Sequence, residues 1–272
     1  MYNVLSLFDG ISCGQVALHR AGIPINKYYA SEIDQRAVKV TQRNWPKTIQ
    51  FGDVTKIRKE HFMSPIDILI GGSPCQGFSF AGKQLNFEDP RSKLFFEFVR
   101  LRDELQPKYF FLENVRMVKE SEKVITEYMG VEPIYFDSKN VSAGNRYRIY
   151  WTNIPGFVAP KDKGILLKHI LEKDSQGYVH DFRKGIHRYK PVEKAVCLGA
   201  SYYKGIDNHQ ARTCIKIDGT EKYRMMTVVE CCRQMGLPDN YCDSISRSAA
   251  YHALGNGWEV NTIVEFFKNI PK

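Results

Sequence analysis

The chain has 272 residues, of which 43% are hydrophobic and 25% charged, and its formal net charge is +9. A chain of this length can bury one large domain with a smaller one beside it. It contains neither a run of the ~20 apolar residues that cross a bilayer nor a signal-peptide pattern, so composition excludes a membrane-spanning protein and predicts a soluble, intracellular one.

Short apolar strands alternate with amphipathic helices through residues 1–154. The predicted strands are Val4–Phe8, Lys27–Ser31, Ile66–Ile70, Tyr109–Leu112, Val131–Phe136 and Tyr147–Trp151. The predicted helices are Cys13–Ala21, Gln35–Asn44, Leu94–Leu105 and Glu122–Met129. Alternation at this spacing is typical of βαβ units in a mostly parallel sheet. We therefore predict an α/β fold for this part of the chain.

The regular pattern weakens after residue 154. Residues 155–222 are polar, interrupted by Gly and Pro, and carry 13 Lys and Arg against 8 Asp and Glu. Residues 223–272 carry 5 of each, so the middle segment is the more basic of the two. We interpret residues 155–222 as a small separate lobe that faces nucleic acid; basic proteins that bind no nucleic acid can have the same charge balance.

Helical patterns return in residues 223–272. Thr227 and Glu230 have the spacing of a capping box, which predicts a helix that ends near Gln234 or Met235. Two further helices are expected at Ser246–Leu254 and Val260–Lys268. The chain thus leaves its main domain, builds a lobe and returns.

Cys75 is the most informative of the seven cysteines. The cysteines are odd in number and include no CxxC pair, which argues against a disulfide framework and a structural zinc site. Cys75 follows the predicted strand Ile66–Ile70, in the sequence Gly72-Ser73-Pro74-Cys75-Gln76-Gly77-Phe78. Ligands of open parallel sheets bind beyond the carboxyl ends of strands. Turn-forming neighbours argue against a buried structural cysteine, so we predict a nucleophile.

A glycine-containing turn, Phe8-Asp9-Gly10-Ile11-Ser12-Cys13-Gly14, joins the first strand to the first helix. Its spacing is not GxGxxG, which disfavours a dinucleotide. Glu32 ends the second strand, where a carboxylate can accept hydrogen bonds from ribose hydroxyls, and Asp53 follows the third. A ribose and an adenine without a pyrophosphate suggest S-adenosylmethionine, but such a turn also simply joins strands to helices.

Two more motifs carry charged residues at strand ends. Glu113 ends a later strand in Leu112-Glu113-Asn114-Val115, where it is either solvated, a helix cap, or an acid that burial beside Cys75 keeps protonated. Asn145-Arg146-Tyr147-Arg148 enters a strand, and alternation puts Arg146 and Arg148 on one face. One arginine can pair with carboxylates while the other stabilises negative charge on a substrate.

Together these motifs resemble the DNA cytosine-5 methyltransferase family. The matches, in family order, are Phe8-Asp9-Gly10, Gly72-Ser73-Pro74-Cys75-Gln76, Glu113-Asn114-Val115, Asn145-Arg146-Tyr147-Arg148, Arg224–Glu230 continuing through Arg233, Gly236 and Pro238-Asp239, and Gly255-Asn256-Gly257-Trp258. Gly144 departs from the glutamine that often opens the family's arginine motif. The Asn-Arg-x-Arg form and Trp258 are more similar to vertebrate de novo methyltransferases and their phage or bacterial relatives.

The resemblance implies a Rossmann-like S-adenosylmethionine-dependent methyltransferase sheet with a target-recognition lobe. Its implied segments are 1–154 (catalytic and cofactor-binding), 155–222 (recognition) and 223–272 (returning to the catalytic domain). Cys75 would attack C6 of a flipped-out cytosine, Glu113 would hydrogen-bond N3, and Arg148 would contact O2 with Arg146 in support. The methyl group would pass to C5, leaving S-adenosylhomocysteine, and no metal is implied.

The resemblance also implies binding residues and partners. The implied cofactor residues are Phe8, Asp9, Gly10, Ile11, Gly14, Glu32, Ile33, Asp53, Val54, Pro74, Asn256 and Trp258. The implied macromolecular partners are double-stranded DNA and a cognate restriction endonuclease. The loop Gln76–Arg91 would close over the flipped base. Phosphate or base contacts are expected among Arg183, Lys184, His187, Arg188, Lys204, His209 and Arg212, none of which is singled out for specificity.

Two alternatives stay open on the sequence. A transfer-RNA cytosine-5 methyltransferase would use a closely similar motif set. A catalytically inactive, DNA-binding paralogue would typically have lost Cys75, Glu113 or Arg148, all of which are present.

Overall fold

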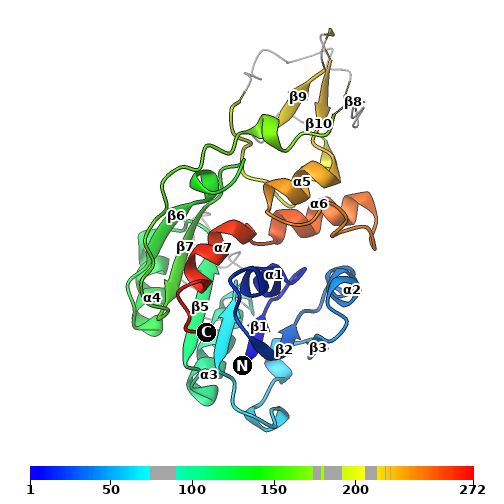
Figure 1. Cartoon of the computed structure of the whole chain (residues 1–272). Coiled ribbons are helices and arrows are strands. Elements are labelled where there is room, and N and C mark those ends of the chain that lie inside the picture. The colour runs from blue at the N-terminus through cyan, green and yellow to red at the C-terminus, as the bar shows by residue number, and fades with distance from the viewer. Residues whose placement is uncertain (74–89, 174–178, 181–191, 206–212, 218, 221) are drawn as a thin grey trace. The chain divides into compact units, whose positions relative to one another are not determined.

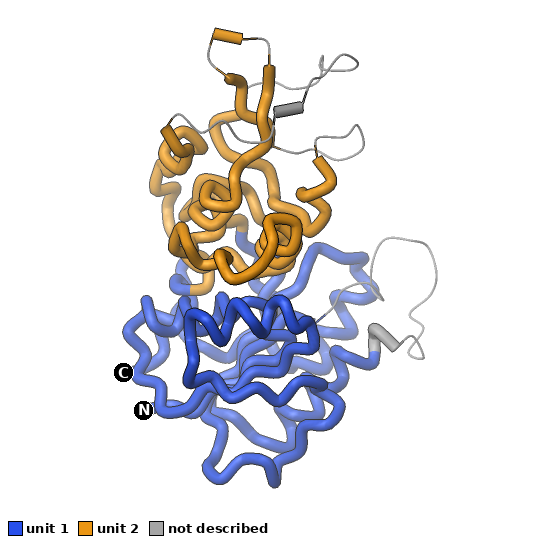
Figure 2. Tube along the Cα trace, turned by 90° about the vertical axis from the view of Figure 1, so that its right-hand side faces the viewer, with its two compact units in different colours: residues 1–136, 147–159, 264–272 blue, residues 137–146, 160–263 orange. Residues whose placement is uncertain are grey.

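The computed structural model describes residues 1–73, 90–173, 179–180, 192–205, 213–217, 219–220 and 222–272. The chain forms two compact units, which are described separately below (Figure 2). Unit 1 comprises residues 1–136, 147–159 and 264–272, and unit 2 comprises residues 137–146 and 160–263. No helix in the described part of the chain is both long enough and apolar enough to cross a bilayer.

A seven-stranded sheet, ordered β3-β2-β1-β4-β5-β7-β6, is the framework of unit 1 (Figure 1). Its strands are β1 (Tyr2–Leu7), β2 (Ile25–Ser31), β3 (Ile49–Gln50), β4 (Ile68–Gly71), β5 (Tyr109–Asn114), β6 (Ile134–Asp137) and β7 (Tyr147–Thr152). Strands β1 to β5 pair in parallel, and β7 runs antiparallel to β5. The predicted α/β fold with a mostly parallel sheet is confirmed.

Four helices connect the strands of unit 1: α1 (Cys13–Arg20), α2 (Gln35–Asn44), α3 (Pro90–Leu105) and α4 (Lys119–Met129). The bounds of α2 match the prediction, and its N-cap Asp34 accepts a hydrogen bond from the Arg36 amide. Helices α3 and α4 begin earlier than predicted, at Pro90 and Lys119. The 3₁₀ turns of the whole chain include Val54–Lys56, Lys59–His61, Ser138–Asn140, Leu167–His169 and Tyr202–Lys204.

The core of unit 1 holds the strand ends in place. Ile68, Leu69 and Ile70 of β4 are fully buried, as expected for a central parallel strand covered on both faces. Phe95 and Phe98 of α3 pack with Leu69 in one hydrophobic cluster, which also contains Leu5, Leu7, Leu112 and Trp151. The loops that leave β1, β4 and β5 therefore start from rigid positions.

The end of the chain also packs against this sheet. Helix α7 (Val260–Phe267) finishes in unit 1, where Phe266 and Phe267 each contact the ring of Phe111 with centroids 5.2 Å apart. Only residues 264–272 of the C-terminal segment belong to unit 1.

Unit 2 contains a small antiparallel sheet, ordered β8-β10-β9. Its elements are β8 (Val179–His180), β9 (Cys214–Lys216), β10 (Tyr223–Met225), α5 (Val228–Gln234) and α6 (Arg247–Asn256). The predicted capping box is confirmed, because Thr227 Oγ1 accepts from the Glu230 amide at 3.1 Å and Glu230 Oε2 accepts from the Thr227 amide at 2.9 Å. The buried Arg224 guanidinium pairs with the same Glu230 carboxylate at 2.8 Å.

The two compact units do not coincide with the three segments expected from sequence. Residues 223–263 cluster with 160–222, although they were expected to return to the catalytic domain. Because compact units need not coincide with functional domains, the three functional segments stay a prediction.

Candidate active site

Glu113, near the end of β5, and Arg148, near the start of β7, form an ion pair in unit 1. Glu113 is opposite Tyr150 in the antiparallel pairing of β5 and β7, so Arg148, two residues away, lies on the same face. Arg148 Nε lies 2.8 Å from Glu113 Oε1, and the side chains are 13% and 11% exposed. Arg148 Nη1 also donates to the Tyr147 carbonyl at 2.8 Å. Arg148 thus pairs with a carboxylate, as was expected for one of the two motif arginines.

Asn114, the next residue, reaches the loop that leaves β4. Its Nδ2 lies 3.3 Å from Ser73 Oγ and 3.4 Å from the Ser73 carbonyl, and its Oδ1 accepts from the Val115 amide at 2.8 Å. Ser73 directly precedes Pro74 and Cys75 in the sequence. The sequence analysis did not single out this tether, because an amide that links two strand ends leaves no periodic signal.

Cys75 and Pro74 lie outside the described residues, as do residues 76–89 of the predicted closing loop. Their roles stay predictions. The same holds for the recognition-lobe residues Arg183, Lys184, His187, Arg188, His209 and Arg212. Lys204 is described, and its side chain is exposed at the end of the turn Tyr202–Lys204.

The turn after β1 has an unusual backbone and a fixed carboxylate. Phe8, Gly10 and Ser12 have φ values of 56°, 57° and 58°. The left-handed region is costly for side-chain-bearing residues, so the surrounding contacts must hold this turn. Glu32, at the end of β2, supplies one contact: its Oε2 accepts from the Gly10 amide at 2.8 Å. Its Oε1 accepts from the amides of Ile33 and Asp34, each at 2.8 Å.

Asp9 holds the same turn from the inside. Its Oδ1 accepts from the Tyr28 hydroxyl at 2.8 Å, and its Oδ2 accepts from the Ser12 hydroxyl. Burial raises the pKa of Asp9 to about 6, against the lowering effect of hydrogen bonds from Ser12, Ser6 and Tyr28. Because both of its oxygens are engaged within the protein, Asp9 shapes the turn.

The residues around this turn fit an adenosine group. A Cβ atom on Gly10 or Gly52 would meet no atom within 4 Å, so space is open beside both backbones. The Ile33 side chain is 73% exposed next to the Glu32 carboxylate, which offers an apolar surface beside a hydrogen-bond acceptor. Asp53 follows Gly52, and the hydrogen bond from the Thr55 amide lowers its pKa, so this carboxylate stays ionised.

The other predicted cofactor residues of unit 1 are less accessible. Ile11, Gly14 and Val54 are buried, and Phe8 is half-buried against the core. The three buried residues expose little surface to a ligand.

Arg146 belongs to unit 2 and is buried, with 5% of the residue exposed. Its Nη1 donates to the Leu198 carbonyl at 3.1 Å, and its Nη2 donates to the carbonyls of Gly255 and Gly257 at 3.1 and 2.6 Å. Arg146 therefore clamps the stretch that contains Asn256 and leads to Trp258. Asn256 is exposed and Trp258 half-buried, and their contact with a cofactor stays a prediction.

Gly144 has a steric explanation within unit 2. A Cβ atom at this position would lie 2.2 Å from Gln234 Nε2. Gln234 is 3% exposed, and its Nε2 donates to the Val196 carbonyl at 3.0 Å. The Gln234 side chain thus occupies the space that any larger residue at position 144 would need.

The chain resembles proteins of known type along nearly its whole length. The family model for the C-5 cytosine-specific DNA methylase matches residues 2–130 and 148–272. The type II methyltransferase M.HpaII of Haemophilus parainfluenzae is 29% identical over 321 aligned residues, which cover 99% of this chain and 89% of the relative. The type II methyltransferase M1.ScrFI of Lactococcus lactis subsp. cremoris is 31% identical over 305, which cover 96% of this chain and 76% of the relative.

A solved structure shares the fold. The S. pombe Dnmt2 methyltransferase superposes with a TM-score of 0.77 at 20% identity, with 98% of each chain covered.

Proposed function

Because the chain belongs to the C-5 cytosine-specific DNA methylase family, and is thus a cytosine C5 methyltransferase that uses S-adenosylmethionine, we propose that it methylates cytosine within a specific sequence of double-stranded DNA. The observation that carries the proposal is the buried Glu113–Arg148 pair on β5 and β7. The neighbouring Asn114 tethers Ser73, two residues before Cys75. A nucleophile, an acid and a cation would thereby be supplied from adjoining strand ends.

Cys75 is the group that we assign to attack the ring. C5 of cytosine is a poor nucleophile, and addition of the Cys75 thiolate to C6 makes C5 electron-rich. S-adenosylmethionine supplies an electrophilic methyl group on its sulfonium. After the C5–methyl bond forms, water removes the C5 proton, the electron pair restores the C5–C6 double bond, and the thiolate leaves C6.

Glu113 and Arg148 would stabilise the charge that thiolate addition places on the ring. We assign Glu113 Oε2 to hydrogen-bond N3, since Oε1 already faces the Arg148 guanidinium. Arg148 would hold Glu113 in this orientation and donate to the cytosine O2. Donors that are fixed before the reaction stabilise developing charge without reorganisation. Arg146 would act only in support, because its contacts in unit 2 include three backbone carbonyls.

The target ring is stacked in a duplex, so the cytosine must leave the helix before Cys75 reaches C6. Extrusion costs roughly a few kcal/mol, which contacts with the flipped base and the surrounding strand must offset. The basic segment 155–222 would supply phosphate contacts. The named relatives are bacterial type II methyltransferases, so we expect action in a bacterial cytoplasm, with a restriction endonuclease of the same specificity as partner.

Expression in a host without cytosine methylation, followed by bisulfite sequencing, tests reaction, substrate and target together. We expect 5-methylcytosine at one recurring sequence. Methyl incorporation should be measured side by side into duplex DNA and transfer RNA, and transfer to RNA alone would replace DNA as the substrate.

The Cys75→Ala variant should lose methyl transfer while keeping its melting temperature and its affinity for S-adenosylhomocysteine. Cys214→Ala, which removes a half-buried thiol from β9, is the matched control and should stay active. An active Cys75→Ala variant would contradict the nucleophile assignment.

A further inference from the structure

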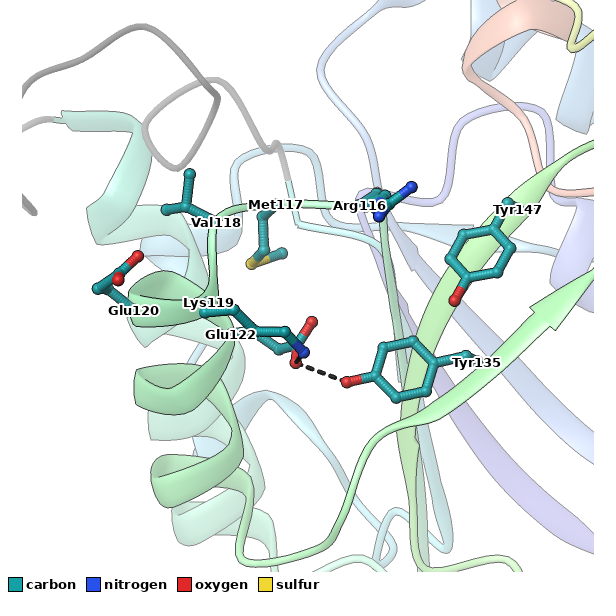
Figure 3. Close-up of a pocket in the computed structure, with 8 residues that line it drawn as sticks. All are labelled: Arg116, Met117, Val118, Lys119, Glu120, Glu122, Tyr135 and Tyr147. Atoms are coloured by element: carbon teal, nitrogen blue, oxygen red, sulfur yellow. Dashed lines mark hydrogen bonds and ion pairs between the residues drawn. The ribbon is translucent and has the colours of Figure 1, made fainter.

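A pocket of about 770 Å³ opens in unit 1 beside the strand ends that carry Glu113 and Arg148 (Figure 3). Its volume is within the range of roughly 300–1,000 Å³ typical of small-molecule sites. The lining residues are Arg116, Met117, Val118, Lys119, Glu120, Glu122, Tyr135 and Tyr147. None of them was among the site residues expected from sequence.

Two exposed tyrosines form one wall of the pocket. Tyr135 on β6 and Tyr147 on β7 are each 42% exposed, and their rings are stacked with centroids 6.4 Å apart and planes 25° apart. The Tyr135 hydroxyl donates to Glu122 Oε1 at 2.5 Å, which fixes its ring. Paired aromatic rings that keep this much surface exposed offer a stacking platform to a planar ligand.

The Arg116 guanidinium supplies a positive charge beside these two tyrosines. Figure 3 shows Arg116 on the side of the pocket nearest Tyr147, whereas Glu120 lies on the far side. Among the described residues, no carboxylate forms an ion pair with Arg116. Glu122 forms an ion pair within the pocket with Lys119, whose Nζ lies 3.0 Å from Glu122 Oε1. The guanidinium of Arg116 is thus placed to receive an anion beside an aromatic platform.

This combination matches the chemistry of a nucleotide. Bases stack on tyrosine rings, and phosphates pair with arginine. Resting on the proposed function, we propose that the pocket binds a nucleotide of the strand that carries the target cytosine. The base stacks on Tyr147 and Tyr135, and a phosphate pairs with Arg116.

The position of the pocket explains why it takes a neighbouring nucleotide and not the target. Arg116 is three residues after Glu113, and Tyr147 directly precedes Arg148, so pocket and candidate active site share two chain segments. Successive side chains of a strand point to opposite faces, which places Tyr147 on the other face from Arg148. A base on Tyr147 is therefore a different base from the one that meets Glu113.

The test compares Arg116→Glu and Tyr147→Ala with the wild type. The probe is a short fluorescein-labelled duplex that contains the sequence mapped by bisulfite. Both variants should raise the dissociation constant and the KM for DNA by about 10-fold or more, because Tyr147→Ala removes the stacking surface and Arg116→Glu removes the phosphate contact. Tyr147→Phe keeps the ring and should restore most of the affinity. The melting temperature and the affinity for S-adenosylhomocysteine should not change.

Lys123→Glu is the matched control for the charge reversal. Lys123 is on α4, the helix that follows Arg116 in the chain; its side chain is 79% exposed, and it does not line the pocket. It should change the KM for DNA less than about 2-fold, since an exposed charge outside the contact is screened.

Wild-type DNA affinity and KM in both Arg116→Glu and Tyr147→Ala would overturn the subsite. If both variants instead lose binding of deoxycytidine monophosphate but keep DNA binding, the pocket serves a free nucleotide and the proposal is wrong. If the wild type transfers no methyl group to DNA, the proposed function fails. Binding of a labelled duplex of arbitrary sequence then tests the DNA subsite independently of methyl transfer. A wild type that binds no duplex overturns the subsite as well.

Discussion

Arg148 Nε and Glu113 Oε1 lie 2.8 Å apart, and both side chains are more than four-fifths buried. Two oppositely charged groups in this position hold each other in place. Removing one partner leaves the other charge buried without compensation, which typically costs about 3–5 kcal/mol. Substitutions that keep the shape of the pair therefore give a clearer test than truncations.

The Glu113→Gln variant should lower kcat by roughly 10²- to 10⁴-fold, because an amide cannot deliver a proton to N3. The KM for S-adenosylmethionine should change little, since Glu113 is assigned to the cytosine. Steady-state methyl incorporation measures both values. Glu127→Gln removes an exposed carboxylate from α4 and should behave as wild type. A wild-type kcat for Glu113→Gln across neutral pH would contradict its role as the acid.

The Glu32→Ala variant should weaken binding of S-adenosylhomocysteine by about 10- to 100-fold, or about 1.4–2.8 kcal/mol. Glu32 accepts hydrogen bonds from the Gly10, Ile33 and Asp34 amides, so its loss releases the turn as well as the ribose contact that we propose for it. Isothermal titration calorimetry gives the dissociation constant. The exposed Glu60 supplies the control variant Glu60→Ala, which should keep wild-type affinity. Unchanged binding in Glu32→Ala would place the cofactor elsewhere.

Asp9 should make part of the stability depend on pH. Burial raises its pKa to about 6 in the folded chain, so between about pH 4 and pH 6 the folded state keeps a proton that the unfolded state has released. The contribution of Asp9 to stability therefore falls as pH rises through this window, by about 2–3 kcal/mol in total. Asp9→Asn lacks this titration.

The measurement for Asp9 is the melting temperature of wild type and Asp9→Asn from pH 4 to pH 7. The wild type should lose stability relative to Asp9→Asn as pH rises, whatever the slope from the other carboxyl groups. A difference that is constant with pH, or that changes in the opposite direction, would show that the pKa of Asp9 is not raised.

Gly144 and Gln234 should be coupled energetically. Gly144→Ala forces the new methyl group against the buried Gln234 amide and should destabilise the fold by about 1–3 kcal/mol. Gln234→Ala removes the obstacle, so the double variant should be more stable than the sum of the single effects predicts. Denaturant unfolding of the four proteins gives the coupling energy, and strict additivity would rule out the steric explanation.

Much of the fold follows from local patterns in the sequence. The helix Gln35–Asn44 and the capping box of Thr227 with Glu230 match the structure, since each depends on residues three or four apart. Strands β3 and β8 have two residues each, too few to produce a period. Such strands exist because a neighbouring strand binds them, which no local pattern records.

The candidate site was predictable in its residue types but not in its contacts. The sequence patterns predicted Glu113 at the end of one strand and Arg148 at the start of another, and their direct pairing depends on the antiparallel register of β5 with β7. The tether from Asn114 to Ser73 and the occupation of the space beside Gly144 by Gln234 join residues far apart in the chain. Only the packed structure brings those partners together.

The hydrogen bonds of Arg146 have a practical consequence for exchanging recognition regions between relatives. A chimera cut at residue 155, where the regular sequence pattern ends, would take the carbonyls of Leu198, Gly255 and Gly257 from one parent and the guanidinium from the other. Grafting residues 137–146 together with 160–263 keeps donor and acceptors from a single parent. The two arginines of one short motif thus belong to different compact units, and one boundary between these units lies at the peptide bond between Arg146 and Tyr147.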